Sequence, residues 1–545
     1  MLSIFVNENA ILILVINMSK RMLSLYMLIV ACFMALMVRI AYINFSEFSA
    51  AGETQGYRTL TIGASRGKIY DRSLNKLVDS ESELIAAVTP AIGSEEYLNE
   101  YFETDALKEK IEKGFPFTAR VDSEINNEFI RTFSVPIRYS GDMLATHLIG
   151  YLNSEGTDGV SGLEKAYNNY LKQNSGSLSV SFDVDAWGRV LAGMDKYIND
   201  DNFNSDAGIV LTLDKRIQKI VEQELEKSSI ESGCAIVMHV NNGEILAMAS
   251  VPDYDPDNVS DYLSADNSPF VNKALKSYSV GSVFKPVIGA AALENGVDPM
   301  AEYECTGSIT VGDRTFNCYN QKAHGTVNME TALQNSCNTY FINLIMNIDT
   351  DYLLQLCRQM GLGQGDEIAD GISAAEGFLP SAESLELKGN LANFAFGQGE
   401  LLMTPVQMAK AYHVLATGRY IAPTVVMGFT DSYGTVTEKG NGVAQKVLSE
   451  ETVATLRQML LSVTEEGNAQ NAKSELVGLA GKTGTAQSGI YENGSEICRT
   501  WFSGFFPAKN PHYIVIVMNE NGEGGNTDCA PVFKAICERI VLDSD

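Results

Sequence analysis

The chain has 545 residues, which is too many for one ordinary domain, so two or three domains are expected. Its hydrophobic content of 45% is normal for a globular protein and supports a sizeable core. The formal net charge of -28 argues against nucleic acids or anionic lipid headgroups as partners, because like charges repel.

The first predicted element is a mostly apolar run from Met22 to Ile43, which is long enough to span a bilayer as a helix. Lys20 and Arg21 precede it, so residues 1–21 are expected in the cytoplasm and the remainder outside. A cleaved signal peptide is the alternative, but the run is longer than the usual apolar segment of roughly 7–15 residues, which favours a retained anchor. Residues 1–17 are expected to be an upstream extension.

Two regions of different character follow the anchor. Residues 44–206 are mixed and polar, with short strand-like runs, and amount to one domain. Residues 207–545 alternate clear strand and helix patterns. The expected elements are a strand and helix over 208–225, a hairpin around 241–243, helices after 281 and over about 330–360, strands over 478–487, 500–507 and 512–519, and a closing helix over 530–542. This order predicts an α+β fold, an antiparallel sheet with helices on its faces.

The segment Gly281–Leu293 places Ser282 and Lys285 three residues apart, on one face of a predicted helix. Pro286 is tolerated only in the first turn, which puts Ser282 at the helix N-terminus. The helix dipole and burial there both disfavour a protonated lysine. A serine beside an uncharged lysine is a nucleophile with its base. The pattern alone is weak, because S-x-x-K also occurs at Ser65 and Ser73.

The nine cysteines are scattered along the chain without a C-x-x-C pair. Cys305 and Cys318 flank a predicted hairpin, and outside the membrane they could form a disulfide; two free thiols are an equally good interpretation. None of the five histidines falls in a ligand pattern. We therefore expect no catalytic metal and no cofactor.

Two further motifs follow Ser282 in order. "QNSCNTYF" supplies Ser336 and Asn338, two residues apart in a helical region. "AGKTGTAQ" supplies the only K-[ST]-G of the chain, on a predicted strand; it comprises Lys482, Thr483, Gly484 and the following Thr485. Each triplet alone would fit a capped turn or an edge strand. Together, a nucleophile, a base, an oxyanion site and a cationic anchor for a carboxylate are what acyl transfer requires.

These three motifs resemble those of the penicillin-binding proteins and serine β-lactamases, in which S-x-x-K, a serine-containing triplet and K-T-G form one cleft. The resemblance is closest to the high-molecular-mass class B penicillin-binding proteins, and it runs from the anchor to near the C-terminus. The segments that carry it outside the three motifs are "RGKIYDR" (66–72), the stretch 138–171 with H-x-x-G-Y and G-x-x-G-x-E, "GEILAMASVPDYDP" (243–256) and "FGQGELLMTPVQMAKAY" (396–412).

The resemblance implies a role for each residue of the first two motifs. Ser282 would attack the penultimate D-Ala carbonyl of a D-Ala-D-Ala stem peptide, and neutral Lys285 would accept its proton. Ser336 would relay a proton to the departing D-Ala. Asn338 would bind the substrate amide and hold Lys285. Cys337 departs from the family pattern in the middle of the second triplet, and it is expected to point away from the substrate.

For the third motif, the resemblance implies that Lys482 supplies a positive field while Thr483 and Thr485 bind the terminal carboxylate, with Gly484 between them. The backbone N–H groups of Ser282 and Thr485 would form the oxyanion hole. A β-lactam would mimic the dipeptide and leave a slow acyl-enzyme at Ser282.

The whole chain is thus expected to be a serine-type peptidoglycan D,D-transpeptidase. It would be a single-pass protein of the cell membrane, with residues 44–206 as an elongated pedestal or dimerisation domain and residues 207–545 as an extracytoplasmic transpeptidase domain. No room remains before the catalytic part for a glycosyltransferase domain, so the resemblance implies a membrane glycosyltransferase partner of the shape, elongation, division and sporulation group. The alternatives are a D,D-carboxypeptidase or β-lactamase-like hydrolase and a non-catalytic scaffold.

Overall fold

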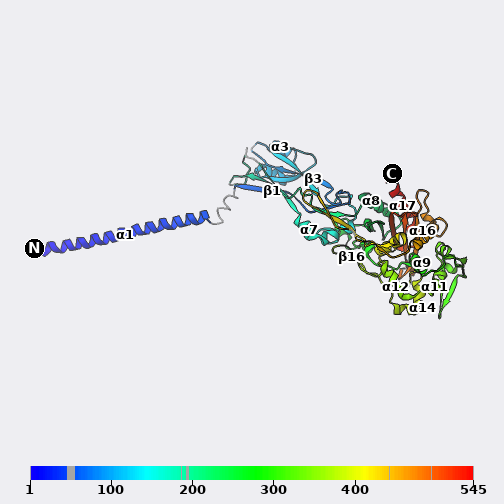
Figure 1. Cartoon of the computed structure of the whole chain (residues 1–545). Coiled ribbons are helices and arrows are strands. Elements are labelled where there is room, and N and C mark those ends of the chain that lie inside the picture. Colours follow the sequence, from blue (N-terminus) through cyan, green and yellow to red (C-terminus); the bar gives the residue numbers. More distant parts are fainter. Residues whose placement is uncertain are drawn as a thin grey trace. The chain divides into compact units, whose positions relative to one another are not determined.

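The computed structural model describes residues 2–45, 56–91, 93–102, 104–185, 187–191, 196–440, 442–492 and 494–543 (Figure 1). Contacts between residues divide the chain into two compact units. The smaller unit comprises residues 1–64, 83–135 and 176–203, and the larger comprises 65–82, 136–175 and 204–545. The start of the expected pedestal, residues 46–55, lies outside the described residues.

The N-terminal helix α1, Leu2–Phe45, contains the predicted apolar run. Its segment Lys20–Tyr42 is long and apolar enough to cross a membrane, and its large apolar side chains are exposed. A signal sequence has the same properties of length and composition, so the helix is compatible with both interpretations of the sequence.

The rest of the smaller unit is built around two three-stranded sheets, in the orders β1-β6-β7 and β4-β3-β5. Alternating side chains of these strands bury two small apolar clusters, one around Phe182 and one around Phe117. The strands are β1 (Tyr57–Ser65), β6 (Gly176–Asp183), β7 (Tyr197–Asp201), β3 (Glu81–Val88), β4 (Phe117–Val121) and β5 (Ile130–Ile137), and the helices are α3 (Glu95–Asn99) and α4 (Asp105–Glu112).

The larger unit takes segments from both sides of the boundary expected near residue 206. Strand β2, Lys68–Tyr70, pairs in parallel with β8, Gly208–Leu211, in a sheet of order β19-β18-β8-β2. Before that boundary, buried Glu164 joins the segments that carry Arg66 and Arg138, because it accepts a hydrogen bond from Nε of Arg66 at 2.9 Å and another from Nε of Arg138 at 2.8 Å. The division into domains 44–206 and 207–545 stays a prediction.

The remaining elements of that four-stranded sheet and its neighbours are short. They are β18 (Val426–Thr430), β19 (Val436–Glu438), β17 (Arg419–Tyr420), β20 (Gln445–Lys446), β15 (Asp366–Ala369), β16 (Ile372–Ala374), α5 (Thr146–Ile149), α6 (Gly162–Ala166) and α7 (Asn168–Gln173).

The centre of the larger unit is a five-stranded antiparallel sheet in the order β10-β9-β23-β22-β21. The prediction that an early hairpin joins three late strands in one sheet is therefore confirmed. The hairpin is β9 (Gly233–His239) with β10 (Ile245–Val251), and the late strands are β21 (Ala480–Glu492), β22 (Ser495–Phe506) and β23 (Tyr513–Gly522).

Helices cover this sheet, as the alternation of elements predicts. Helices α8 (Lys215–Glu226) and α17 (Cys529–Leu542) pack against each other and against the sheet, where Phe533 stacks on Phe502 at a centroid distance of 4.2 Å. Helix α15 (Pro405–Thr417) is buried over almost its whole length, because it lies between the sheet and further helices. Those helices are α9 (Lys285–Glu294) and α16 (Glu450–Glu465).

Beyond α9 the chain forms a helical lobe, in which α9, α11, α12 and α14 lie together (Figure 1). Its elements are α10 (Met329–Gln334), α11 (Asn338–Ile345), α12 (Thr350–Gln359), α13 (Ala382–Glu386) and α14 (Lys388–Phe394), with the short strands β11 (Tyr303–Cys305), β12 (Ser308–Val311), β13 (Arg314–Asn317) and β14 (Gly325–Val327). The hairpin predicted between Cys305 and Cys318 is the pair β12–β13.

Candidate active site

The predicted nucleophile Ser282 lies in a single turn of 3₁₀ helix, Gly281–Phe284, that leads directly into α9. Pro286 occupies the first turn of α9, as the sequence predicts. Helix α15 stabilises this turn, since the hydroxyl of Tyr412 donates to the carbonyl of Val283 at 3.0 Å. Ser282 itself is half-buried while its neighbours are buried, so its side chain is the accessible member of a fixed turn.

Glycine at position 281 allows other segments to reach this turn. Gly281 has a φ of +63°, and its N–H donates to the carbonyl of Gly397 at 2.9 Å. A Cβ atom there would lie 2.9 Å from the carbonyl oxygen of Thr485, closer than real Cβ contacts. The absence of a side chain therefore lets strand β21 approach the residue next to Ser282.

Lys285 connects the first motif to the second. Its Nζ donates to the carbonyl of Ser336 at 2.6 Å and to Oδ1 of Asn338 at 2.7 Å, and lies 3.1 Å from Oγ of Ser336. The amine is fully buried, and burial lowers its pKa to about 7, although nearby thiols act in the opposite direction. This lysine can therefore be uncharged near neutral pH, which a general base requires.

The second motif has an unusual backbone. Helix α10 ends at Gln334, and Ser336 then adopts a left-handed conformation with a φ of +52° before α11 begins at Asn338. Non-glycine residues rarely take this conformation, which costs on the order of 1–3 kcal/mol and persists only where surrounding contacts impose it. Here Lys285 holds the carbonyl of Ser336, while Nδ2 of Asn338 donates to the carbonyl of Asn317 at 2.9 Å.

The third motif lies on β21, an edge strand of the central sheet. A Cβ atom at Gly484 would lie 2.7 Å from the carbonyl oxygen of Val280 and 3.0 Å from Cγ1 of Val283, so only glycine permits this approach of the strand to the serine turn. Thr485 is exposed beside that turn, and its hydroxyl accepts a hydrogen bond from the N–H of Gly525 at 3.3 Å.

Lys482 is fully buried, and its Nζ donates to the carbonyl of Thr483 at 3.1 Å. Burial, with a further contribution from the charge of Lys285, lowers the pKa of Lys482 well below its ordinary value. The charge of Lys285 therefore disfavours protonation of Lys482. A bound carboxylate would reverse this effect and favour the charged form of Lys482.

The structure thus brings the predicted residues together in two sets. Lys285, Ser336 and Asn338 are in direct hydrogen-bond contact, and the strand that carries Lys482, Thr483, Gly484 and Thr485 approaches the turn that carries Ser282. The catalytic and binding roles of these residues stay predictions.

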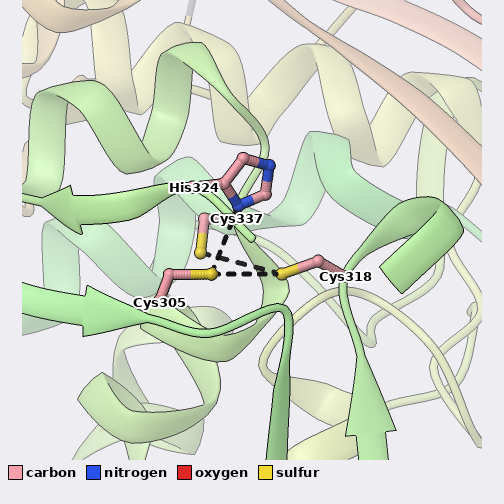
Figure 2. Close-up of side chains that lie close together, drawn as sticks. All are labelled: Cys305, Cys318, His324 and Cys337. Atoms are coloured by element: carbon pink, nitrogen blue, oxygen red, sulfur yellow. Dashed lines mark hydrogen bonds between the residues drawn. The ribbon is translucent and has the colours of Figure 1, made fainter. Parts of the chain in front are cut away.

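A group of four residues beside the second motif was missed by the sequence analysis (Figure 2). The ligand-type atoms of Cys305, Cys318, His324 and Cys337 all lie within 4.8 Å of one another. The sulfurs of Cys305 and Cys318, the two residues considered for a disulfide, lie 3.8 Å apart and are not bonded. The spacing C-x12-C-x5-H-x12-C is the signal that could have indicated the group, but it matches no common ligand pattern.

Comparison with known proteins identifies the family of the domain that carries these motifs. Residues 233–538, more than half of the chain, match the family described as penicillin binding protein transpeptidase domain. The chain is 29% identical to stage V sporulation protein D of Bacillus subtilis, over 95% of this chain and 84% of that protein. It is 28% identical to peptidoglycan D,D-transpeptidase MrdA of Acinetobacter baumannii, over 92% of this chain and 84% of that protein.

Solved structures show the same fold. Penicillin-binding protein 3 of Mycobacterium tuberculosis in complex with ampicillin has a TM-score of 0.64 at 24% identity, over 89% of this chain and 96% of that chain. A chain from a peptidoglycan synthase complex has a TM-score of 0.68 at 23% identity, over 95% of this chain and 97% of that chain. With the family match covering residues from β9 to α17, the chain belongs to the class B penicillin-binding proteins and carries their transpeptidase domain.

Proposed function

We propose that this protein is a peptidoglycan D,D-transpeptidase that cross-links stem peptides through an acyl-enzyme at Ser282. The observation that carries the proposal is the buried Lys285, whose pKa is lowered to about 7 and whose amine contacts the second motif. An uncharged amine at the head of α9, one helical turn from Ser282, is suited to take the hydroxyl proton.

In the first half-reaction, Oγ of Ser282 forms a bond to the penultimate D-Ala carbonyl and transfers its proton to Lys285. The C–N bond to the terminal D-Ala then breaks, and the leaving amine receives a proton through Ser336, which contacts Lys285. Backbone N–H groups of Ser282 and Thr485 would stabilise the oxyanion; such a donor typically lowers the barrier by about 3–4 kcal/mol. In the second half-reaction, an amine of another stem peptide attacks the ester and restores the Ser282 hydroxyl.

The third motif would bind the substrate's terminal carboxylate. Lys482 would become protonated as the carboxylate binds, while the hydroxyls of Thr483 and Thr485 would donate to the carboxylate. Gly484 supports this role indirectly, because it permits β21 to lie against the serine turn. Asn338 would bind the substrate amide while it holds Lys285.

The N-terminal part would anchor and place the enzyme. We infer that the apolar segment of α1 spans the cell membrane with residues 1–21 in the cytoplasm, and that residues 44–206 act as a pedestal for an extracytoplasmic catalytic domain of residues 207–545. Glycan chains would then come from a membrane glycosyltransferase of the shape, elongation, division and sporulation group. The similarity to a chain of a peptidoglycan synthase complex supports such a partnership.

The test is a product assay with the full-length chain in detergent, a stem-peptide donor ending in D-Ala-D-Ala and an amine acceptor. We expect cross-linked dimer together with one released D-Ala per cross-link, and neither product from Ser282→Ala. Released D-Ala without dimer would identify a carboxypeptidase-like hydrolase instead. Two results together would identify a scaffold. The wild-type protein would release no D-Ala in this assay, and cells that carry Ser282→Ala would still synthesise their wall.

A further inference from the structure

We propose that Cys305, Cys318, His324 and Cys337 bind one structural zinc ion beside the second motif. The four residues come from four separate points of the helical lobe: the end of β11, the residue after β13, the residue before β14 and the residue before α11. Figure 2 shows the three sulfurs and the imidazole ring converging on one point. None of the four side chains takes a chemical step in the proposed acyl transfer.

The distances fit a tetrahedral zinc site. A Zn–S bond of about 2.3 Å and a tetrahedral angle place two sulfur ligands about 3.8 Å apart. The separations of Cys318 Sγ from Cys305 Sγ and from Cys337 Sγ are both 3.8 Å. A Zn–N bond of about 2.0–2.1 Å gives a sulfur–nitrogen separation of about 3.5 Å, and Cys305 Sγ lies 3.4 Å from Nδ1 of His324.

A disulfide accounts less well for the same group. The sulfur of Cys318 is equidistant from those of Cys305 and Cys337, and it can bond to only one of them. Either disulfide would leave one buried thiol and His324 with no part in the bond. A disulfide bond of about 2.05 Å would also need the sulfurs to move together by well over an ångström. Four ligands around one centre use every member of the group.

The surroundings support a closed, structural site. Cys305, Cys318 and Cys337 are all at most 2% exposed, and the hydroxyl of Thr339 donates to Cys305 Sγ at 3.1 Å and lies 3.3 Å from Cys337 Sγ. Such outer contacts orient metal ligands. Three thiolates and one imidazole form a soft ligand set that selects zinc, and four protein ligands leave no open position for catalysis. Binding would release the thiol protons.

The site has a consequence for the second motif, and this consequence rests on the proposed function. Cys337 lies between Ser336 and Asn338, both of which contact Lys285. A metal bound to Cys337 would fix the chain immediately after the left-handed Ser336, and so would maintain that backbone conformation. The ion would act as a positioning device for the proton relay without touching the substrate.

The experiment measures metal content and penicillin acylation on the same full-length chain in detergent. The reduced protein is loaded with Zn²⁺, dialysed and analysed by elemental mass spectrometry. We expect one zinc per wild-type chain, loss of most of it in Cys305→Ala and His324→Ala, and full retention in the control Cys498→Ser, whose cysteine lies on β22 away from the group. Replacement with Co²⁺ should give thiolate charge-transfer bands and the intense d–d absorption of a tetrahedral site.

The proposal is overturned if the reduced wild type retains no zinc, or if both ligand variants retain as much as the control. It is also overturned if peptide mapping of protein purified without reductant shows a disulfide within the group at full occupancy. Removal of zinc by a chelator should slow acylation at least tenfold and lower Tm. Unchanged acylation after complete removal would refute the positioning role alone, whereas zinc binding by a protein that penicillin never labels would refute the proposed function alone.

Discussion

Substitution of Lys285 by methionine tests the assignment of the general base, because it removes the amine and keeps a long unbranched side chain. Burial lowers the pKa of Lys285 from 10.5 to about 7, which corresponds to roughly 5 kcal/mol against the protonated form. Loss of a general base typically slows a reaction by about 10²–10⁴-fold. We expect a loss in this range in the rate of acylation by a fluorescent penicillin.

The fold should survive this substitution. Three hydrogen bonds of Lys285, to the carbonyl and the hydroxyl of Ser336 and to Asn338, are lost, and each buried group left unpaired costs about 1–3 kcal/mol. Methionine no longer carries the cost of a buried amine, which offsets part of that loss. Thermal unfolding measured beside the labelling rate separates a chemical defect from an unfolded protein.

The pH dependence of the acylation rate tests the role of Lys285 more specifically than the size of the rate loss does. Below a pH of about 7 the Lys285 amine is protonated and cannot accept the serine proton, so wild-type acylation should rise with pH and level off above about 7. Lys285→Met should lack this rise. A wild-type profile with its inflection near 10, or a variant that keeps the wild-type profile and rate, would refute the assignment of Lys285 as base.

Three further predictions concern geometry and stability. Gly484→Ala should slow acylation on the order of 10²-fold, because the new Cβ pushes β21 off the serine turn; Gly440→Ala, where a Cβ meets open space, is the matched control in the same labelling assay. Asn338→Ala should slow acylation by roughly ten- to a hundredfold, the equivalent of one hydrogen bond to Lys285 as it becomes charged on accepting the serine proton, and an unchanged rate would exclude a role in holding the base. Asp366→Ala should lower the free energy of unfolding by about 3–5 kcal/mol, because the substitution leaves the buried amine of Lys410, which lies 2.6 Å from Oδ1 of Asp366, without its carboxylate partner. Asp370→Ala is the control, because its partner Lys439 is exposed, and it should change the free energy of unfolding by about 1 kcal/mol or less. Denaturant titrations of both variants check this difference.

Features that depend on local sequence were predictable. The apolar run lies in a helix, the turn around 241–243 joins β9 to β10, and Pro286 fixes where α9 begins. Each follows from a few adjacent residues whose side-chain chemistry restricts the backbone. The central sheet could also be anticipated, since the early hairpin and the three late strands are apolar segments that one antiparallel sheet can bury together.

Features that depend on distant pairing were not predictable from one sequence. The short β2 has too few residues to reveal its parallel partner β8, which follows after more than a hundred residues. The left-handed Ser336 has no local signal, because serine is not a residue that favours this conformation. The Cys and His group comes from four separate points of a lobe whose strands are only three or four residues long, so its ligands are not spaced as in a known metal motif.

Intact-mass spectrometry after penicillin treatment, with peptide mapping of the adduct, tests the central claim most directly. We predict one penicilloyl group per full-length chain, attached to Ser282, and no adduct on Ser282→Ala when that variant unfolds at the wild-type temperature. An adduct on another residue, or equal labelling of Ser282→Ala, would contradict an acyl-transfer site at the head of α9.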